Sequence, residues 1–114
     1  MSNCIFCKII AGELPGKIVY EDDKCLAFDD VSPKAPVHTL VVPREHIPTM
    51  NDLADKHKEL LGHLCMVVAK VAGIKKIKDP GFRVVINCNQ AGGQMVYHLH
   101  IHVMGGRQMS WPPG

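Results

Sequence analysis

The sequence predicts a single α+β domain over residues 1–114, made of a five-stranded antiparallel sheet, one short helix and one long helix. A length of 114 residues suits one domain and leaves little room for a second. Five segments have the length and the apolar or alternating character of strands, at residues 17–20, 25–28, 37–42, 82–87 and 97–103. One long stretch, beginning at Asn51 or Asp52, repeats apolar residues every three or four positions.

The connections between these segments support the antiparallel arrangement. Residues 4–11 carry apolar side chains at helical spacing up to Gly12, which predicts a short N-terminal helix. A polar turn at 21–24 joins the first two strands into a hairpin, and tight turns favour antiparallel pairing. The apolar stripe of the long helix, from Leu53 to Val71, is expected to pack on the sheet. The lysines at 75–78 are expected to form a solvated turn.

Histidine alternates with apolar residues throughout the last predicted strand, Tyr97-His98-Leu99-His100-Ile101-His102-Val103. Because successive side chains of a strand point to opposite faces, the three imidazoles are expected on one face and the other four side chains on the other. Side chains two positions apart lie about 6.5–7 Å apart along a strand, so adjacent imidazoles can share a small ligand. This pattern predicts one buried face and one chemical face.

Two chemistries fit three histidines on one face. A neutral imidazole can attack phosphorus and form a covalent intermediate, and histidine suits this near neutral pH because its ordinary pKa is about 6.5. Alternatively, three imidazoles can hold a catalytic zinc ion. Gly92 and Gly93 come just before the histidines, where a turn without side chains can offer backbone amides to an anion.

Cys4 and Cys7 form a C-x-x-C pair, whose spacing lets two thiolates meet one zinc ion. A tetrahedral structural site needs two more ligands, and His46 and His98 are the candidates. An incidental pair and a redox-active pair are the alternatives. The redox interpretation is the weaker one, because no strand precedes Cys4.

Composition limits the partners and the cell compartment. The chain is 46% hydrophobic and 21% charged, which predicts a packed core. Its 13 basic and 11 acidic residues form no basic run, so no polymeric nucleic acid is expected as a partner. No stretch resembles a membrane span or a signal peptide, and five cysteines suit a reducing compartment, so we expect a cytoplasmic protein, with the nucleus not distinguished. The cysteines at 25, 65 and 88 are expected to be buried.

The stretch His98-Leu99-His100-Ile101-His102-Val103-Met104 resembles the histidine triad motif of the HIT superfamily. Further segments resemble its nucleotide-binding (Hint) branch, and they cover nearly the whole chain: residues 28–33, 35–38, 42–47, 92–94, 105–109 and Trp111-Pro112-Pro113-Gly114. The resemblance implies a homodimer whose two sheets form a ten-stranded surface, with the long helices packed at the interface. The tail, residues 105–114, would then dock near the partner's active site.

The resemblance also implies the activity of a purine nucleoside phosphoramidase. Such proteins bind purine nucleoside monophosphates and hydrolyse the P–N bond of AMP or GMP phosphoramidates. His100 would be the nucleophile that forms a nucleotidyl-histidine intermediate, and His98 and His102 would orient it and the phosphate, with His38 as a further support. No cofactor is required for this chemistry.

The resemblance assigns the other substrate-binding residues by position. Asp30 would bind the ribose hydroxyls, and Trp111 would reach the partner's site. Phosphate oxygens would be held by Asn87, Gly93, Gln94, Met95 and Val96. The purine would lie in an apolar slot made by Ile5, Phe6, Ile9, Phe28, Val31 and Leu40. In the zinc-binding subset of the branch, Cys4, Cys7, His46 and His98 would hold a structural zinc ion.

One position departs from the branch and keeps other functions open. The branch usually has serine at Met95, and that hydroxyl assists the leaving group, so amine release is expected to be slower here. A nucleotide-binding scaffold with weak hydrolysis is therefore one alternative. A dinucleoside polyphosphate hydrolase is another; a nucleotidyl transferase typically has glutamine at the third histidine, where this chain has His102.

Overall fold

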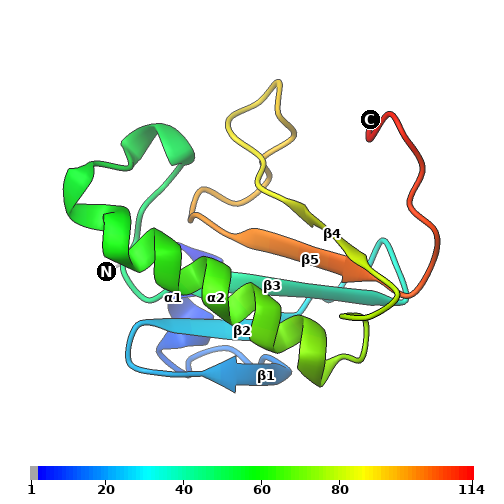
Figure 1. The fold of residues 1–114 in the computed structure, drawn as a ribbon. Coiled ribbons are helices and arrows are strands. Elements are labelled where there is room, and N and C mark those ends of the chain that lie inside the picture. The colour runs from blue at the N-terminus through cyan, green and yellow to red at the C-terminus, as the bar shows by residue number, and fades with distance from the viewer. Residues whose placement is uncertain (1–2) are drawn as a thin grey trace.

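The computed structural model describes residues 3–114, and the prediction for residues 1 and 2 lies outside this range. Within it, five antiparallel strands form one sheet in the order β1-β2-β3-β5-β4 (Figure 1). The strands are β1 Ile18–Glu21, β2 Cys25–Asp29, β3 Val37–Pro43, β4 Phe82–Val85 and β5 Ile101–Gly105. The α+β class and the five-stranded antiparallel sheet are confirmed.

Each face of the sheet is covered by one helix (Figure 1). The long helix α2, Lys58–Ile74, buries Leu64, Val67 and Val71 against one face, and the short helix α1, Ile5–Ile10, buries Phe6 against the other. Alternation along β2 supplies both cores, because Cys25 and Ala27 belong to the α2 side whereas Leu26 and Phe28 belong to the α1 side.

The long helix begins later than predicted. Thr49 caps a 3₁₀ turn at Met50–Asp52, where its hydroxyl oxygen accepts from the Asn51 amide and Asp52 accepts from the Thr49 amide. A second 3₁₀ turn follows at Asp55–His57, and α2 starts only at Lys58. The start predicted at Asn51 or Asp52 is therefore wrong, because the capping pattern there begins a separate short turn and not the long helix.

The last strand also begins later than predicted, at Ile101 instead of Tyr97. The β3–β5 pairing ends at Val41↔Ile101, just before β3 reaches Pro43, which has no N–H to donate. The segment ahead of β5 is held otherwise, since the Leu99 amide donates to the Ile47 carbonyl at 2.6 Å. His98 and His100 thus lie in a loop ahead of the strand.

Three smaller expectations need correction. Cys25 is buried as predicted, but Cys65 is exposed on the outer side of α2 and Cys88 is partly exposed. Lys76 and Lys78 of the lysine turn are exposed as predicted, but Lys75 is only partly exposed, and its ammonium pairs with Asp29 at 2.8 Å. The fourth strand ends at Val85, two residues early. Along residues 3–114, none of the helices has both the length and the apolar character needed to cross a membrane.

Candidate active site and metal centre

A pocket of about 870 Å³ opens on the α1 side of the sheet. Its apolar wall comes from α1 and from the strands beneath it, through Phe6, Ile9, Phe28 and Leu40. Its polar wall comes from β3, from β5 and from the loops next to the strands, through His38, His102, His100, Asp30 and Asn87. The pocket therefore joins an apolar slot to a cluster of imidazoles, which suits a ligand with a flat apolar part and an anionic part.

His100 presents a bare ring nitrogen to this pocket. Its Nδ1–H donates to the main-chain carbonyl of His98 at 2.7 Å, so the proton is on Nδ1 and the lone pair is on Nε2. The edge of the Phe6 ring packs on the imidazole, with centroids 5.1 Å apart and planes at 89°. The hydrogen bond thus fixes the tautomer and the direction of the ring, and Phe6 packs against it.

His102 presents the opposite group, an N–H. The Lys34 amide donates to His38 Nδ1 at 2.9 Å, so His38 carries its proton on Nε2 and donates it to His102 Nδ1, also at 2.9 Å. His102 must then carry its own proton on Nε2. That buried Nε2 has no hydrogen-bond partner within residues 3–114. A buried donor without a partner is costly, and a ligand oxygen can satisfy it.

All three pocket imidazoles are held neutral. Burial lowers the pKa of His100 and of His38 below the ordinary value, more than the nearby Asp30 carboxylate raises either one. Burial also lowers the pKa of His102 to about 4, with His100 and His38 adding to the effect. A neutral His100 keeps the lone pair that a nucleophile needs.

Asp30 lies beside this chain of histidines, with one carboxylate oxygen 3.5 Å from His38 Nε2. The other oxygen accepts from the Ser32 amide at 2.8 Å, and the Asp30 amide donates to the His38 carbonyl at 2.9 Å. The carboxylate is therefore fixed at the pocket wall and can accept further hydrogen bonds.

The turn ahead of the histidines is stabilised by hydrogen bonds between its own main-chain groups. The sequence predicted that amides of this turn could hold an anion. The amides of Gly93 and Gln94 instead donate to carbonyls of the same turn, so these two are not available to a ligand. The Gln94 side chain is buried, accepting from the Asn89 amide and donating to the Pro48 and Val96 carbonyls. A side chain at Gly92 would collide with the Cys88 backbone, so glycine is required there by close approach.

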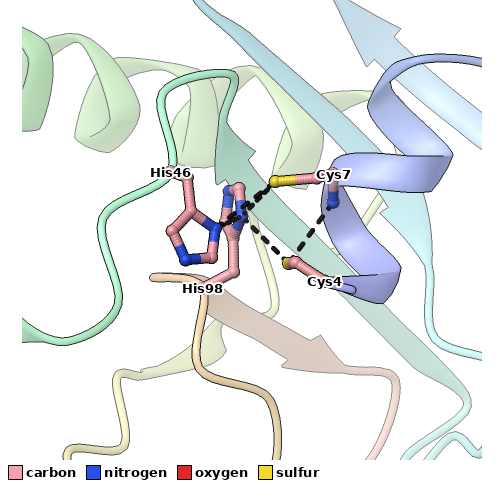
Figure 2. Close-up of side chains that lie close together, drawn as sticks. All are labelled: Cys4, Cys7, His46 and His98. Carbon is pink, nitrogen blue, oxygen red and sulfur yellow. Dashed lines mark hydrogen bonds between the residues drawn. The ribbon is translucent and has the colours of Figure 1, made fainter. Parts of the chain in front are cut away.

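A second cluster lies on the other side of the loop before β5. Cys4, the N-cap of α1, and Cys7 in its first turn face His46 and His98, which come from two other loops (Figure 2). His98 Nδ1 lies 3.4 Å from Cys4 Sγ, 3.5 Å from Cys7 Sγ and 3.1 Å from His46 Nδ1. Cys7 Sγ lies 3.3 Å from His46 Nδ1.

The four donor atoms fit a tetrahedral metal ion. They all lie within 4.8 Å of one another. Zinc at its usual ligand distances requires about 3.5 Å between a sulfur and a nitrogen and about 3.3 Å between two nitrogens, close to the separations found. His98 also has the required tautomer, because its Nε2–H donates to the Pro43 carbonyl at 2.8 Å and leaves Nδ1 bare toward the thiols.

The structure places most of the predicted substrate residues around the pocket. Fourteen of them line it: Ile5, Phe6, Ile9, Phe28, Asp30, Val31, His38, Leu40, Asn87, Gly93, Met95, Val96, His100 and His102. Gln94 and Trp111 do not, since Gln94 is buried within its turn and Trp111 is 81% exposed beside Arg83. His98 is not part of the lining either. It belongs to the cysteine cluster and contacts two pocket residues, His100 through its carbonyl and Phe6 through its ring, with ring centroids 6.0 Å apart.

Some contributors have no signal in the sequence. Lys34 fixes the tautomer of His38 through its main-chain amide, and no residue pattern marks a backbone donor. Leu14, Pro15 and Gly16 line the pocket from a segment without regular structure. Met104 also lines it, and the alternation of His100 and His102 already indicated that face.

Comparison with known proteins agrees with this geometry. The model of the HIT domain family matches residues 11–109. A relative described as an uncharacterized HIT-like protein, from Synechococcus elongatus, is 54% identical over 112 residues, covering 98% of this chain and 97% of its own. A similar relative from Synechocystis is 51% identical, with the same coverage of both chains.

Solved structures of similar proteins have the same fold. A HIT family hydrolase from Legionella pneumophila superposes with a TM-score of 0.96 at 49% identity, covering 98% of this chain and 100% of its own. A histidine triad protein from Clostridium difficile gives 0.93 at 45% identity, and a HIT family hydrolase from Clostridium thermocellum gives 0.94 at 42%, each covering 96% of both chains. The chain with this paired-histidine pocket is therefore a member of the HIT family.

Proposed function

We propose that the protein is a purine nucleoside phosphoramidase, which hydrolyses the P–N bond of AMP or GMP phosphoramidates. The observation that carries this is the pair of complementary nitrogens in one pocket: a bare Nε2 on His100 and an unpartnered Nε2–H on His102. A lone pair beside a donor suits attack on a phosphorus atom whose oxygen is held at the same time.

The reaction divides into two displacements. In the first, the His100 Nε2 lone pair forms a bond to the α-phosphorus and the P–N bond breaks, its electron pair going to the amine nitrogen, which takes a proton from water. In the second, a water molecule attacks the same phosphorus, loses a proton to the hydroxide that the first step left, and displaces neutral His100, so the products are AMP and the amine. His102 Nε2–H donates to a phosphate oxygen throughout, which favours the more highly charged transition state.

The remaining pocket residues suit a nucleotide. The apolar slot at Phe6, Ile9 and Phe28 offers the apolar and aromatic side chains that suit a purine ring. Asp30 can accept both ribose hydroxyls, because a carboxylate offers two oxygens. Asn87 and the main chain at Met95 and Val96 remain our candidates for the phosphate, with Gln94 left out because its side chain is already hydrogen-bonded to main-chain groups.

The test is turnover of an AMP phosphoramidate with a reporter amine. We expect the His100→Ala protein to lose on the order of 10⁴-fold or more of the activity, because it lacks the nucleophile. His63→Ala is a matched control, since His63 pairs with Asp22 outside the pocket and should leave turnover unchanged. Equal amine release by wild-type and His100→Ala proteins would exclude this mechanism and favour a binding scaffold.

We also propose that Cys4, Cys7, His46 and His98 hold a structural zinc ion. Zinc supplies no step of the reaction there. It would join helix α1 to the loops at 46 and 98, and a bond to Nδ1 would keep the His98 ring in the tautomer that its hydrogen bond to Pro43 already favours. His98 thereby acts as a positioning residue, whose carbonyl orients His100.

A homodimer is the assembly that we propose. Strand β4 is an edge of the sheet, with Val84 45% exposed, and the outer side of α2 carries Met66, which is 66% exposed. An open sheet edge beside exposed apolar side chains suits pairing with a second copy. Sedimentation should give twice the chain mass of 12.6 kDa, and a single-chain mass would exclude the ten-stranded sheet.

A further inference from the structure

Helix α1 joins the two sites of this protein. Cys4 and Cys7 face the His46 and His98 side, while Ile5, Phe6 and Ile9 line the pocket. This six-residue helix thus forms one wall of the pocket and, with its N-cap, carries two ligands of the proposed metal centre. A change in the bonding of the two thiols is therefore a change at the pocket wall.

The thiols provide the polar attachment of this wall. In the part of the chain that the structure describes, the side-chain hydrogen bonds that connect α1 and its N-cap to other elements are those of Cys4 and Cys7 with His46 and His98. The rest of the attachment is apolar. Phe6 is its centre, with its ring against Phe28 at 5.4 Å and against His100 at 5.1 Å.

The position of the thiols makes them accessible to an oxidant. Both cysteines are partly exposed, and His46 beside them is exposed. The two sulfur atoms lie within 4.8 Å of each other, and the Cys7 amide donates to Cys4 Sγ at 3.4 Å. Cysteines one turn apart at the start of a helix can form a disulfide, as redox-active C-x-x-C motifs do.

We propose that Cys4 and Cys7 are a thiol-oxidation site that controls the nucleotide pocket. In the reduced state, with its metal ion, the pair fastens α1 over the pocket, and in the disulfide state the metal ion and the contacts to His46 and His98 are lost and the wall loosens. The inference rests on the proposed nucleotide site only for the identity of the ligand that is affected.

The oxidant is a peroxide, and the reaction balances without another reactant. One thiolate displaces hydroxide from the peroxide and becomes a sulfenic acid, with release of one water after proton uptake. The second thiol then displaces the hydroxyl group from that sulfur as a second water, leaving the disulfide. Two hydrogens leave the protein, two electrons pass to the peroxide, and a dithiol reductant reverses the change.

The nucleophile is expected to keep its geometry in both states. His98 is anchored by its Nε2–H bond to the Pro43 carbonyl, and His100 by its Nδ1–H bond to the His98 carbonyl, and neither bond involves a thiol. The wall at Phe6 should therefore move while the His100 lone pair stays in place. Oxidation should weaken nucleotide binding more than it slows the chemical step.

The experiment uses the full chain with Cys65→Ser and Cys88→Ser substitutions, which remove two other cysteines that are at least partly exposed. Hydrogen peroxide is added to the metal-loaded protein, and four quantities are followed: mass, metal release to a coloured chelator, hydrogen exchange of residues 5–10, and AMP affinity by calorimetry. We expect a loss of two hydrogens in the peptide holding Cys4 and Cys7, metal release, and faster exchange in α1. AMP should bind about tenfold more weakly, which equals roughly 1.4 kcal/mol, and a dithiol should restore it.

The Cys4→Ser, Cys7→Ser double variant is the matched control. It should show fast exchange in α1 and weak AMP binding from the start, with no response to peroxide. Oxidised protein with unchanged α1 exchange and unchanged AMP affinity would overturn the inference, and so would peroxide treatment that leaves these two thiols reduced. If the reduced protein fails to bind AMP, the proposed function is wrong, and the exchange of α1 still decides this inference.

Discussion

His98 and His100 are two residues apart and carry their protons on opposite nitrogens. His98 donates from Nε2 to the Pro43 carbonyl and presents Nδ1 to the thiols, whereas His100 donates from Nδ1 to the His98 carbonyl and presents Nε2 to the pocket. Both rings are buried, and burial lowers the pKa of each below its ordinary value. The carbonyl that accepts the proton therefore decides which nitrogen of each ring is left bare, and so separates the metal ligand from the nucleophile that we propose.

Because of this difference, we expect substitutions on the two sides of the loop to affect different properties of the protein. The side of His98 joins α1 to two loops, so damage there should appear mainly as lost stability. The side of His100 and His102 faces a pocket, so damage there should appear mainly as lost turnover. The predictions below test that separation, beginning with the pocket.

Removing the donor on the pocket side should have the largest effect. His102→Ala deletes the unpartnered Nε2–H that would donate to the phosphate in the proposed reaction, and we expect kcat to fall by roughly 10²- to 10³-fold. His102→Gln keeps an N–H donor at this position and should recover part of the loss. Thermal unfolding should change little compared with metal removal, and equal activity of the two variants would contradict a donor role for His102.

Removing metal should produce the opposite result. A strong chelator is expected to lower the Tm by roughly 5–15 °C, because the ion binds the folded chain and joins three segments. At saturating substrate and below the new Tm, kcat should change by less than about threefold, since the hydrogen bonds that orient His100 do not need the ion. Cys7→Ser should start from the chelated Tm, whereas Cys65→Ser should behave as wild type. A chelator that abolishes turnover without lowering the Tm would favour a three-histidine metalloenzyme.

Acid should destabilise the pocket side through His102. Its pKa is about 4 in the folded chain and about 6.5 when unfolded, so between these values the unfolded chain binds more protons. The contribution of His102 to stability is therefore complete above about pH 6.5 and is lost as the pH falls toward 4. Urea unfolding from pH 7.5 to 4.5 should show a slope up to about 1.4 kcal/mol per pH unit steeper in wild type than in His102→Gln. Parallel curves would mean that His102 is not buried as a neutral ring.

The sequence predicted the sheet and both helices because each depends on local periodicity. Alternation placed Leu99, Ile101 and Val103 correctly in the α2-side core, although Tyr97 is exposed. It failed for the start of β5, because the end of pairing depends on Pro43 in a strand distant in sequence. Long-range effects of this kind leave no local pattern.

In the candidate site, too, local sequence patterns predicted some features and long-range contacts determined others. The C-x-x-C spacing identified the cysteine cluster, and the structure brings Cys4, Cys7, His46 and His98 within reach of one ion. The protonated nitrogen of each imidazole could not be predicted, because it depends on carbonyls and amides such as those of Pro43, His98 and Lys34. Gln94 does not line the pocket, because its side-chain amide group is hydrogen-bonded to the main chain at Asn89, Pro48 and Val96.

The smallest expected effect is at Met95, which lines the pocket and is 88% exposed. A thioether cannot donate a hydrogen bond, so the departing amine must take its proton from water. Met95→Ser places a hydroxyl at this rim, and we expect kcat for an alkylamine leaving group to rise about two- to fivefold, because one positioned donor replaces bulk solvent. A phosphate ester of AMP with an acidic phenol needs no such proton and should be cleaved at the same rate by both proteins. An equal gain on both substrates would mean that the smaller side chain eases access to the pocket. Position 95 would then affect turnover through its size and not through proton donation.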